Sequence, residues 1–198
     1  MKYTQVRSTT PQELQLNAGV MLKKFSPETA SFLATDIMAA TTGGFSFSDT
    51  VSYTDLFEDI DNAPKNTMEG KQVESREVKF SGTALTVTPN FVKSLMAAAD
   101  IDSTDETHII PRDILSEDDF EDFWWVGDYS DKNGKTNGGF MAIHIMNALS
   151  TGGLNFKTSD KSKGQFTMNY TAHYTIKDID KVPYEVYIKA GTDELGGE

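Results

Sequence analysis

The sequence predicts a mainly β protein with a sandwich or barrel architecture, and three observations support this. Apolar and polar residues alternate with a period of two over 43–53 and again over 164–174, a pattern typical of half-buried strands. Turn residues recur between such segments. Only one segment, 89–100, has the periodicity of an amphipathic helix. About seven or eight strands and one helix result, with the spacing of sandwiches and barrels.

The remaining strands follow from apolar runs between turn signals. In chain order they are expected at 19–25, 71–88, 123–129, 139–146, 153–158 and 183–188. Residues 139–146 are apolar in both phases, which predicts a strand buried on both faces. In 71–88 the apolar phase changes near Ser81-Gly82, which predicts a bulge there. Asn133-Gly134 predicts a tight hairpin turn.

The predicted helix begins with a recognisable N-terminal signal. Thr88 can cap it, and Pro89 suits its first turn. One face is apolar, formed by Phe91, Val92, Leu95, Met96 and Ala99. This face predicts a helix that flanks the β core.

The chain of 198 residues suits a single domain over 1–198, with three segments that stand apart from it. Residues 1–18 are polar and contain a proline, so we expect an N-terminal arm. Residues 190–198 are expected to be a polar tail. Residues 54–70 break the strand pattern and combine acidic with apolar side chains. A loop of this length is uncommon in a compact domain and is usually functional.

Composition excludes several classes of site and partner. The formal net charge is -12 and the sequence pI is about 4.6, which argues against tight nucleic-acid binding. The acidity either repels passing phosphate or only keeps the protein soluble. The chain has no cysteine, so it has no disulfide or cysteine-based zinc site. This absence fits folding in a reducing cytoplasm.

Membrane insertion and export are not expected. The sequence contains no apolar run of about 18 residues, the length that a membrane-spanning helix needs. The first five residues are polar and do not resemble a signal peptide.

No catalytic constellation emerges, so we expect no enzyme, no cofactor and no metal site. His108, His144 and His173 lack metal-ligand spacing, and His144 is expected to pack in the core. Nucleophile-elbow and phosphate-loop motifs are missing. The acidic runs 58–61 and 117–122 lack the pattern of a calcium loop. A pair of carboxylates for glycoside hydrolysis stays open, although nothing nominates a particular pair.

The adjacent Trp124 and Trp125 leave two interpretations open. On a strand they point to opposite faces, so either one faces outward or both faces are covered. An outward indole favours the alternative function, a monomeric β-sandwich that binds carbohydrate or a cell surface.

Several stretches together resemble one protein family. They are Leu16-Asn17-Ala18-Gly19-Val20, Ala40-Thr41-Thr42-Gly43-Gly44, Phe57-Glu58-Asp59-Ile60-Asp61-Asn62, Pro64-Lys65-Asn66-Thr67, Phe80-Ser81-Gly82-Thr83, Val126-Gly127-Asp128-Tyr129-Ser130-Asp131-Lys132-Asn133-Gly134, Asn147-Ala148-Leu149-Ser150-Thr151-Gly152-Gly153 and Lys181-Val182-Pro183. Over nearly its whole length the chain resembles major tail tube proteins of long-tailed bacteriophages and prophages of Gram-positive bacteria. Phage-tail-like bacteriocins use closely similar subunits, and the sequence leaves both settings open.

The resemblance implies a β-sandwich of the tail-tube fold with one flanking helix and a long extended loop or hairpin. It implies a structural subunit of hexameric rings, which stack into the conduit for DNA ejection. The implied partners are other copies of the chain, tape-measure protein and tail terminator or completion proteins, with DNA passing unbound. The implied location is the virion tail, and the host cytoplasm before assembly.

The resemblance also gives the segments roles. Residues 54–70 become the candidate inter-ring loop, while 1–18 and 190–198 become arms between neighbours. The candidate interface residues are Leu56, Phe57, Glu58, Asp59, Ile60, Asp61 and Pro64. Among them the apolar side chains of Leu56, Phe57 and Ile60 would be the anchors. Negative charge would line the lumen.

Overall fold

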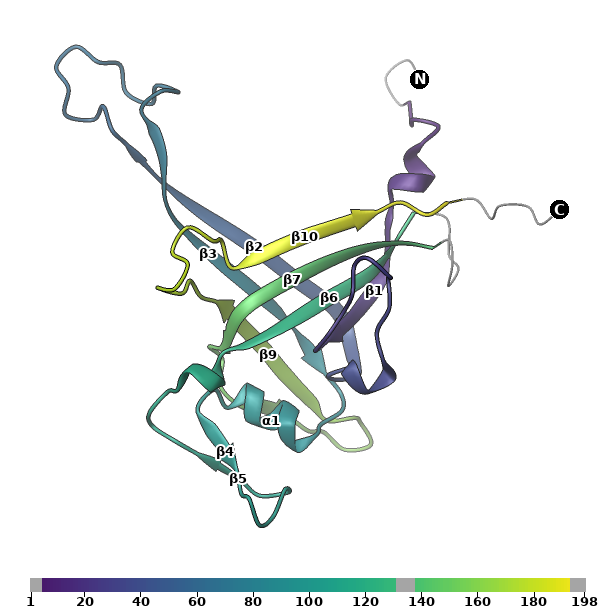
Figure 1. Ribbon diagram of the computed structural model, residues 1–198. Coiled ribbons are helices and arrows are strands. Elements are labelled where there is room, and N and C mark those ends of the chain that lie inside the picture. The colour runs from purple at the N-terminus through teal and green to yellow at the C-terminus, as the bar shows by residue number, and fades with distance from the viewer. Residues whose placement is uncertain (1–4, 131–137, 193–198) are drawn as a thin grey trace.

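One antiparallel sheet of eight strands dominates the computed structural model, which describes residues 5–130 and 138–192 (Figure 1). Its main path runs β1-β6-β7-β9-β3-β2, with β10 beside β7 and β8 beside β9. The bounds of these strands are β1 Gln15–Leu22, β2 Thr41–Asp55, β3 Lys71–Ala84, β6 Glu121–Tyr129, β7 Gly139–Ser150, β8 Asn155–Lys157, β9 Gln165–Ala172 and β10 Tyr184–Lys189. A separate pair joins β4 (Ala99–Ile101) to β5 (Ile109–Pro111).

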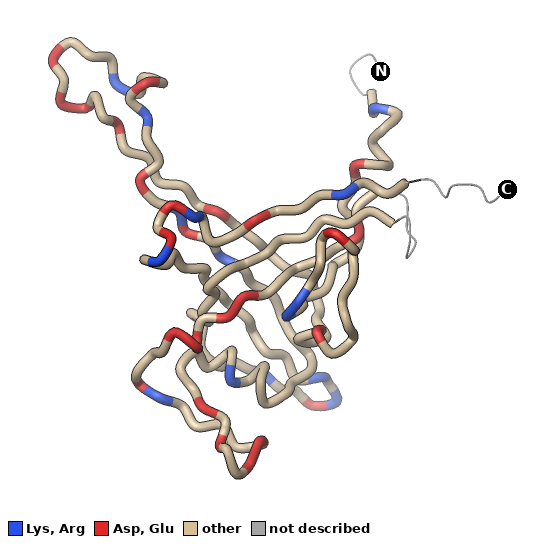
Figure 2. The backbone as a smooth tube through the Cα atoms, in the orientation of Figure 1, with Lys and Arg blue, Asp and Glu red and all other residues tan. Residues whose placement is uncertain are grey.

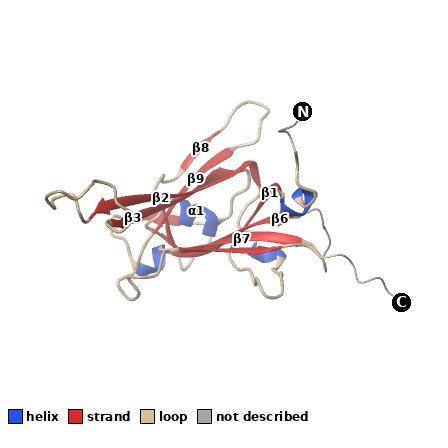
Figure 3. Ribbon diagram, turned by 90° about the horizontal axis from the view of Figure 1, so that it is seen from above, coloured by secondary structure: helices blue, strands red, loops and turns tan. Residues whose placement is uncertain are grey.

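Strand β7 divides this sheet into two layers. One of its edges pairs with β6 over residues 139–148. The other edge pairs first with β10, over residues 140–145, and then with β9, over 148–150. Asn147, with a φ of 48°, lies at the change of partner; asparagine tolerates this left-handed conformation better than most residues. The layers β1-β6-β7-β10 and β8-β9-β3-β2 therefore face each other as a sandwich (Figure 3).

The main core lies between the layers and is rich in aromatic rings. Phe123 packs edge-on against Phe80 and Tyr170, with ring centroids 5.2 and 5.1 Å apart. The short helix α1 (Pro89–Leu95) flanks this core and adds the buried Phe91 and Leu95. The prediction of a mainly β protein with one flanking helix is confirmed, and the large antiparallel sheet is consistent with a β-sandwich.

Helix α1 is shorter than the predicted 89–100. Its start is as expected: Pro89 opens it, and the Phe91 N–H donates to Thr88 Oγ1 over 3.3 Å. The helix ends at Leu95 because Ala97 adopts a φ of 63°, which a right-handed helix does not allow. Ala99 is fully buried, as its apolar periodicity suggests, but it lies in strand β4.

The strand patterns hold best where they are long. The alternating patterns of 43–53 and 164–174 correspond to β2 and β9, and β7 is buried on both faces as predicted. The bulge predicted at Ser81-Gly82 of β3 lies opposite this position, on β2. The extra residues are Gly43 and Gly44 of β2, between the pairs Thr42↔Thr83 and Phe45↔Gly82. Both have φ values near 75°, which favours glycine.

The ends of the strands differ from the sequence prediction in several places. β1 begins at Gln15, so residues 15–18 belong to a strand and not to an arm. Within the arm, residues 10–13 form a short 3-10 helix. Two further 3-10 helices span 34–36 and 117–119. The Asn133-Gly134 turn and most of the 190–198 tail lie outside the described residues.

Candidate assembly site

The segment predicted as a long loop forms the tip of a projecting hairpin. Strands β2 and β3 remain paired as far as Asp55↔Lys71, and residues 56–70 close the end. Figure 1 shows the far end of this hairpin extending away from the rest of the sandwich, and Figure 2 shows charges of both signs along it. The candidate interface residues are therefore gathered at one extremity of the molecule.

One carboxylate organises this tip. Asp55 accepts the N–H of Asn66 over 2.7 Å on one oxygen and the N–H of Phe57 over 3.0 Å on the other. These two backbone hydrogen bonds, from Asn66 first and Phe57 second, hold the pKa of Asp55 below its usual value. The Leu56 N–H also donates to the Gly70 carbonyl over 2.8 Å. The tip is consequently a folded turn and not an extended loop.

The apolar side chains of the tip fall into two groups. Leu56 and Ile60 are 59% and 53% exposed. Phe57 is half-buried and packs within the tip, where a Cβ added to Gly70 would meet its ring at 3.0 Å. The remaining predicted interface residues, Glu58, Asp59, Asp61 and Pro64, are exposed. The structure thus brings all seven together, with Leu56 and Ile60 available to a partner.

Sequence reasoning missed three apolar residues of the hairpin. Met68 in the tip is 84% exposed. Tyr53 and Val73 lie directly opposite each other on β2 and β3, and are 54% and 44% exposed. The period-two pattern places Tyr53 with the core side chains. This pattern does not show that the opposing layer ends before Tyr53.

A polar cluster connects the base of the hairpin to the other layer. Asp49 of β2 forms an ion pair with Arg76 of β3, and Tyr184 of β10 donates to the same carboxylate over 2.9 Å. We call Asp49, Arg76 and Tyr184 the hairpin-base cluster. Burial, and then the hydrogen bond to Asp49, raise the pKa of Tyr184. Since only 13% of the Asp49 side chain is exposed, the two contacts, both to Oδ2, offset part of the cost of burying this charge in an otherwise apolar face.

The acidic segment 117–122 is engaged in local structure. The buried Asp119 accepts hydrogen bonds from Ser116 and an ion pair of 2.6 Å from Arg112. Although burial opposes it, the hydrogen bonds from Ser116 and the Arg112 charge lower the pKa of Asp119. No group of three or more His, Asp or Glu side chains arranged for a metal ion occurs among residues 5–130 and 138–192.

The tryptophans cover both faces of β6. Trp125 packs against the main core and donates from Nε1 to the Ala18 carbonyl over 3.1 Å. Trp124 stacks on His144 with ring centroids 4.1 Å apart, and Phe25 and Tyr187 pack beside it. His144 is therefore packed, as expected. The interpretation of two covered faces is correct, so the indoles do not form the open platform that a carbohydrate-binding module needs.

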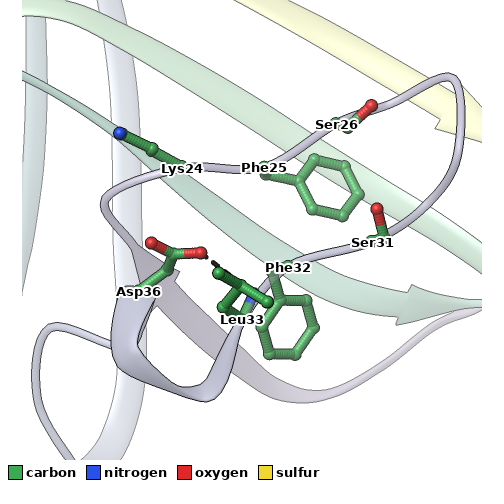
Figure 4. Close-up of a pocket in the computed structure, with 7 residues that line it drawn as sticks. All are labelled: Lys24, Phe25, Ser26, Ser31, Phe32, Leu33 and Asp36. Atoms are coloured by element: carbon green, nitrogen blue, oxygen red, sulfur yellow. Dashed lines mark hydrogen bonds between the residues drawn. The ribbon is translucent and has the colours of Figure 1, made fainter.

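A shallow pocket of about 280 Å³ lies in the segment between β1 and β2 (Figure 4). Its lining residues are Lys24, Phe25, Ser26, Ser31, Phe32, Leu33 and Asp36. The Asp36 carboxylate accepts the Leu33 N–H over 2.9 Å, and Ser31 Oγ bonds to Thr29. These polar groups hold the turn itself, so the pocket offers no arrangement of an acid, a base and a nucleophile.

Comparisons with known proteins give a likeness at the level of structure alone. No family model matches the chain, and no curated protein matches it. Among solved structures, the chain is similar to a chain in the virion of a native gene transfer agent particle, with a TM-score of 0.39 and 10% identity. The alignment covers 87% of this chain and 96% of that chain. No helix among the described residues is long and apolar enough to cross a membrane.

Proposed function

We propose that this protein is the structural subunit of a phage tail tube, or of the tube in a phage-tail-like bacteriocin. Copies assemble into hexameric rings, and the rings stack into the conduit through which DNA leaves the particle. The subunit has no catalytic role and needs no cofactor. Its partners are other copies, the tape-measure protein and the proteins that terminate or complete the tail, and its location is the virion tail.

The projecting hairpin is the observation that carries this proposal. A monomeric protein has no evident use for a 15-residue strand whose far end leaves the sandwich and leads to a tip that exposes Leu56 and Ile60. Exposed apolar side chains that are clustered and rimmed by charge are typical of contact surfaces. In a tube, this hairpin reaches from one ring to the next. The sequence resemblance independently assigns residues 54–70 to that contact.

The layer β8-β9-β3-β2 also suits ring closure, because its two outer strands each have an unpaired edge. Within the described residues, β2 pairs only with β3, and β8 pairs only with β9. The β2 edge is 15 residues long, whereas β8 contributes three residues, and unpaired strand edges favour pairing with another chain. Pairing the β2 edge of one copy with the β8 edge of the next is a head-to-tail contact, which closes into a ring if the rotation allows.

The outward face of this layer bears on how DNA passes. Hydroxyl and amide side chains cover it, contributed by Ser46, Ser48, Thr50, Ser52, Ser81, Thr83, Thr167, Asn169 and Thr171. Lys79 and Glu77 are paired there over 2.8 Å. In the proposed ring this face lines the lumen. The wall is then close to neutral, and the negative charge expected from the sequence is concentrated elsewhere.

Electron microscopy of the purified full chain tests the proposal directly. Negative-stain images at rising protein concentration are expected to show rings and then tubes, with light scattering reporting the mass of the ring. A protein that remains monomeric under all assembly conditions, including addition of a tail-tip or tape-measure nucleus, contradicts it. Binding of that monomer to a glycan array instead favours the carbohydrate-binding alternative.

A further inference from the structure

The two layers are displaced from each other, so each has an apolar strip that the other does not cover. The hairpin tip lies on the opposite side of the molecule from the end of β10, which pairs with the start of β7 (Figure 1). Beyond the hairpin-base cluster, β2 and β3 continue without an opposing strand. Beyond Tyr184, β10 and β7 continue in the other direction.

The first strip lies on the core-facing side of the hairpin. Tyr53 and Val73 are cross-strand neighbours there, in line with the core pair Phe47↔Phe80 further down the same strands. The inward phase is preserved because Glu74 is the extra residue between Ser75 and Val73 in the register. We call Tyr53 and Val73 the hairpin strip.

The second strip lies on the core-facing side of β10 and β7. Val186 pairs with Ile143 and Ile188 pairs with Met141, in the same phase as Tyr184, which reaches the core. Even so, Val186 is 44% exposed and Ile188 is 59% exposed. Met141 is half-buried. We call Val186, Ile188 and Met141 the β10 strip.

We propose that the hairpin strip of one copy packs on the β10 strip of a second copy, so that the sandwich continues from one subunit into the next. Each strip is a core-facing sheet surface with no sheet opposite it. The hairpin strip belongs to the layer that the β10 strip lacks, and the β10 strip belongs to the layer that the hairpin strip lacks. An aromatic ring facing β-branched and long aliphatic side chains is typical of packed sheet faces. This inference rests on the proposed function, because it names the surface that receives the hairpin.

The occupant of each strip in this proposal is another copy of this chain, because the chain itself carries both complementary strips. Because the strips are at opposite ends of one molecule, a subunit cannot join its own two strips. The contact is heterologous, so one copy that donates its hairpin still has a free β10 strip for the next donor. Such a contact repeats without limit along one direction, which is what a tube of stacked rings requires.

Disulfide trapping tests the contact. Because the chain has no cysteine of its own, only the introduced cysteines can form a disulfide. Tagged Tyr53→Cys protein is mixed with untagged Ile188→Cys protein, assembled and oxidised mildly. A tagged–untagged heterodimer is expected on a non-reducing gel. The matched control is Thr54→Cys, which is exposed on the opposite face of the same strand. Its yield with Ile188→Cys should be roughly tenfold lower, since a disulfide needs Cβ atoms about 4 Å apart.

Three outcomes separate this inference from the proposed function. Tubes that form without the Tyr53–Ile188 cross-link, or with equal cross-linking of the Thr54 control, overturn the inference and leave the function standing. Absence of rings and tubes for the unmodified chain overturns the function itself. As a second measurement, Ile188→Lys should keep its melting temperature, because the side chain is exposed, but should lose tube growth. Normal tube growth by this variant also contradicts the inference.

Discussion

Tyr184 of β10 donates a hydrogen bond of 2.9 Å to the carboxylate of Asp49 on β2, and this bond connects the two layers at the base of the hairpin. Phe47 packs beside it, with its ring centroid 5.2 Å from that of Tyr184. The direction in which the hairpin leaves the body is therefore fixed by a polar contact and an aromatic contact together. Removing the hydroxyl should separate their contributions.

The Tyr184→Phe variant is expected to lose about 1 kcal/mol of unfolding free energy, the usual net value of one hydrogen bond. Asp49→Ala should lose more, about 2–3 kcal/mol, because Arg76 then keeps a partly buried charge without its partner. Denaturant unfolding measures both. Lys79→Ala is the control, since its exposed ion pair should contribute under about 0.5 kcal/mol. Equal losses in all three variants would contradict a specific role for the cluster.

The same bond gives a dependence on alkaline pH. Because the pKa of Tyr184 is raised in the folded protein above its ordinary 10.0, the protonated phenol stabilises the fold. This contribution is complete below pH 10 and is lost as the pH rises through the folded value. Thermal melts across this range should show a smaller alkaline loss in Tyr184→Phe than in the natural protein.

The hairpin tip should respond to acid through Asp55. Its pKa is depressed by the N–H groups of Asn66 and Phe57, so the ordering that it provides is present above pH 3.8 and is lost as the pH falls through the folded value. Asp55→Asn should accelerate amide hydrogen exchange at Asn66 and Phe57 at neutral pH, measured by NMR or mass spectrometry. Asp61→Asn, an exposed carboxylate of the same tip, should leave both rates unchanged. Slow exchange at both amides in Asp55→Asn would show that the tip folds without this carboxylate.

A second response to acid is expected at His144 of β7, in the layer β1-β6-β7-β10. Burial holds its pKa below 6.5, against the opposing influence of Asp122 and Glu185. The neutral, Trp124-stacked ring is therefore the stabilising form. Its contribution is complete above pH 6.5 and is lost as the pH falls through the folded value. His144→Phe should flatten the melting temperature between about pH 7.5 and pH 5, whereas His108→Gln, on an exposed loop, should retain the slope.

The sequence correctly predicted the strands that keep one face buried along their whole length. Strand β9 keeps Met168 and Tyr170 buried in one phase, as its alternation indicated. The hydroxyl of Tyr170 is buried beside Ser94 of α1, and burial raises its pKa. Such periodicity reports whether a side is buried. It does not report which element does the burying.

What the sequence did not predict depends on where one layer stops covering the other. Val186 and Ile188 have the alternation of a buried face and are exposed, because β10 extends past β2 and β3. Asp49 breaks the apolar phase, but its partner Tyr184 is 135 positions away in the chain. The change of partner along β7 at Asn147 is likewise a tertiary feature. A local sequence pattern carries no information on contacts between residues so far apart in the chain.

Deletion of the hairpin tip tests its role in stacking. Removing residues 56–66 leaves β2 and β3 paired below the tip, and these residues add no member to the main core. The shortened subunit is therefore expected to fold with a melting temperature close to that of the full chain. It should form single rings but no tubes in electron micrographs.

A point variant distinguishes lost contacts from lost length. Leu56→Ser with Ile60→Ser keeps the backbone turn, since its main hydrogen bonds come from Asp55 and the main chain. It removes the two exposed apolar side chains of the tip. We expect rings to persist while tube growth becomes weaker, because burying each such side chain contributes about 1.5–3 kcal/mol to a contact. If both the deletion and this variant grow normal tubes, the tip has no part in stacking, and the contact between rings must lie lower on the hairpin or elsewhere on the subunit.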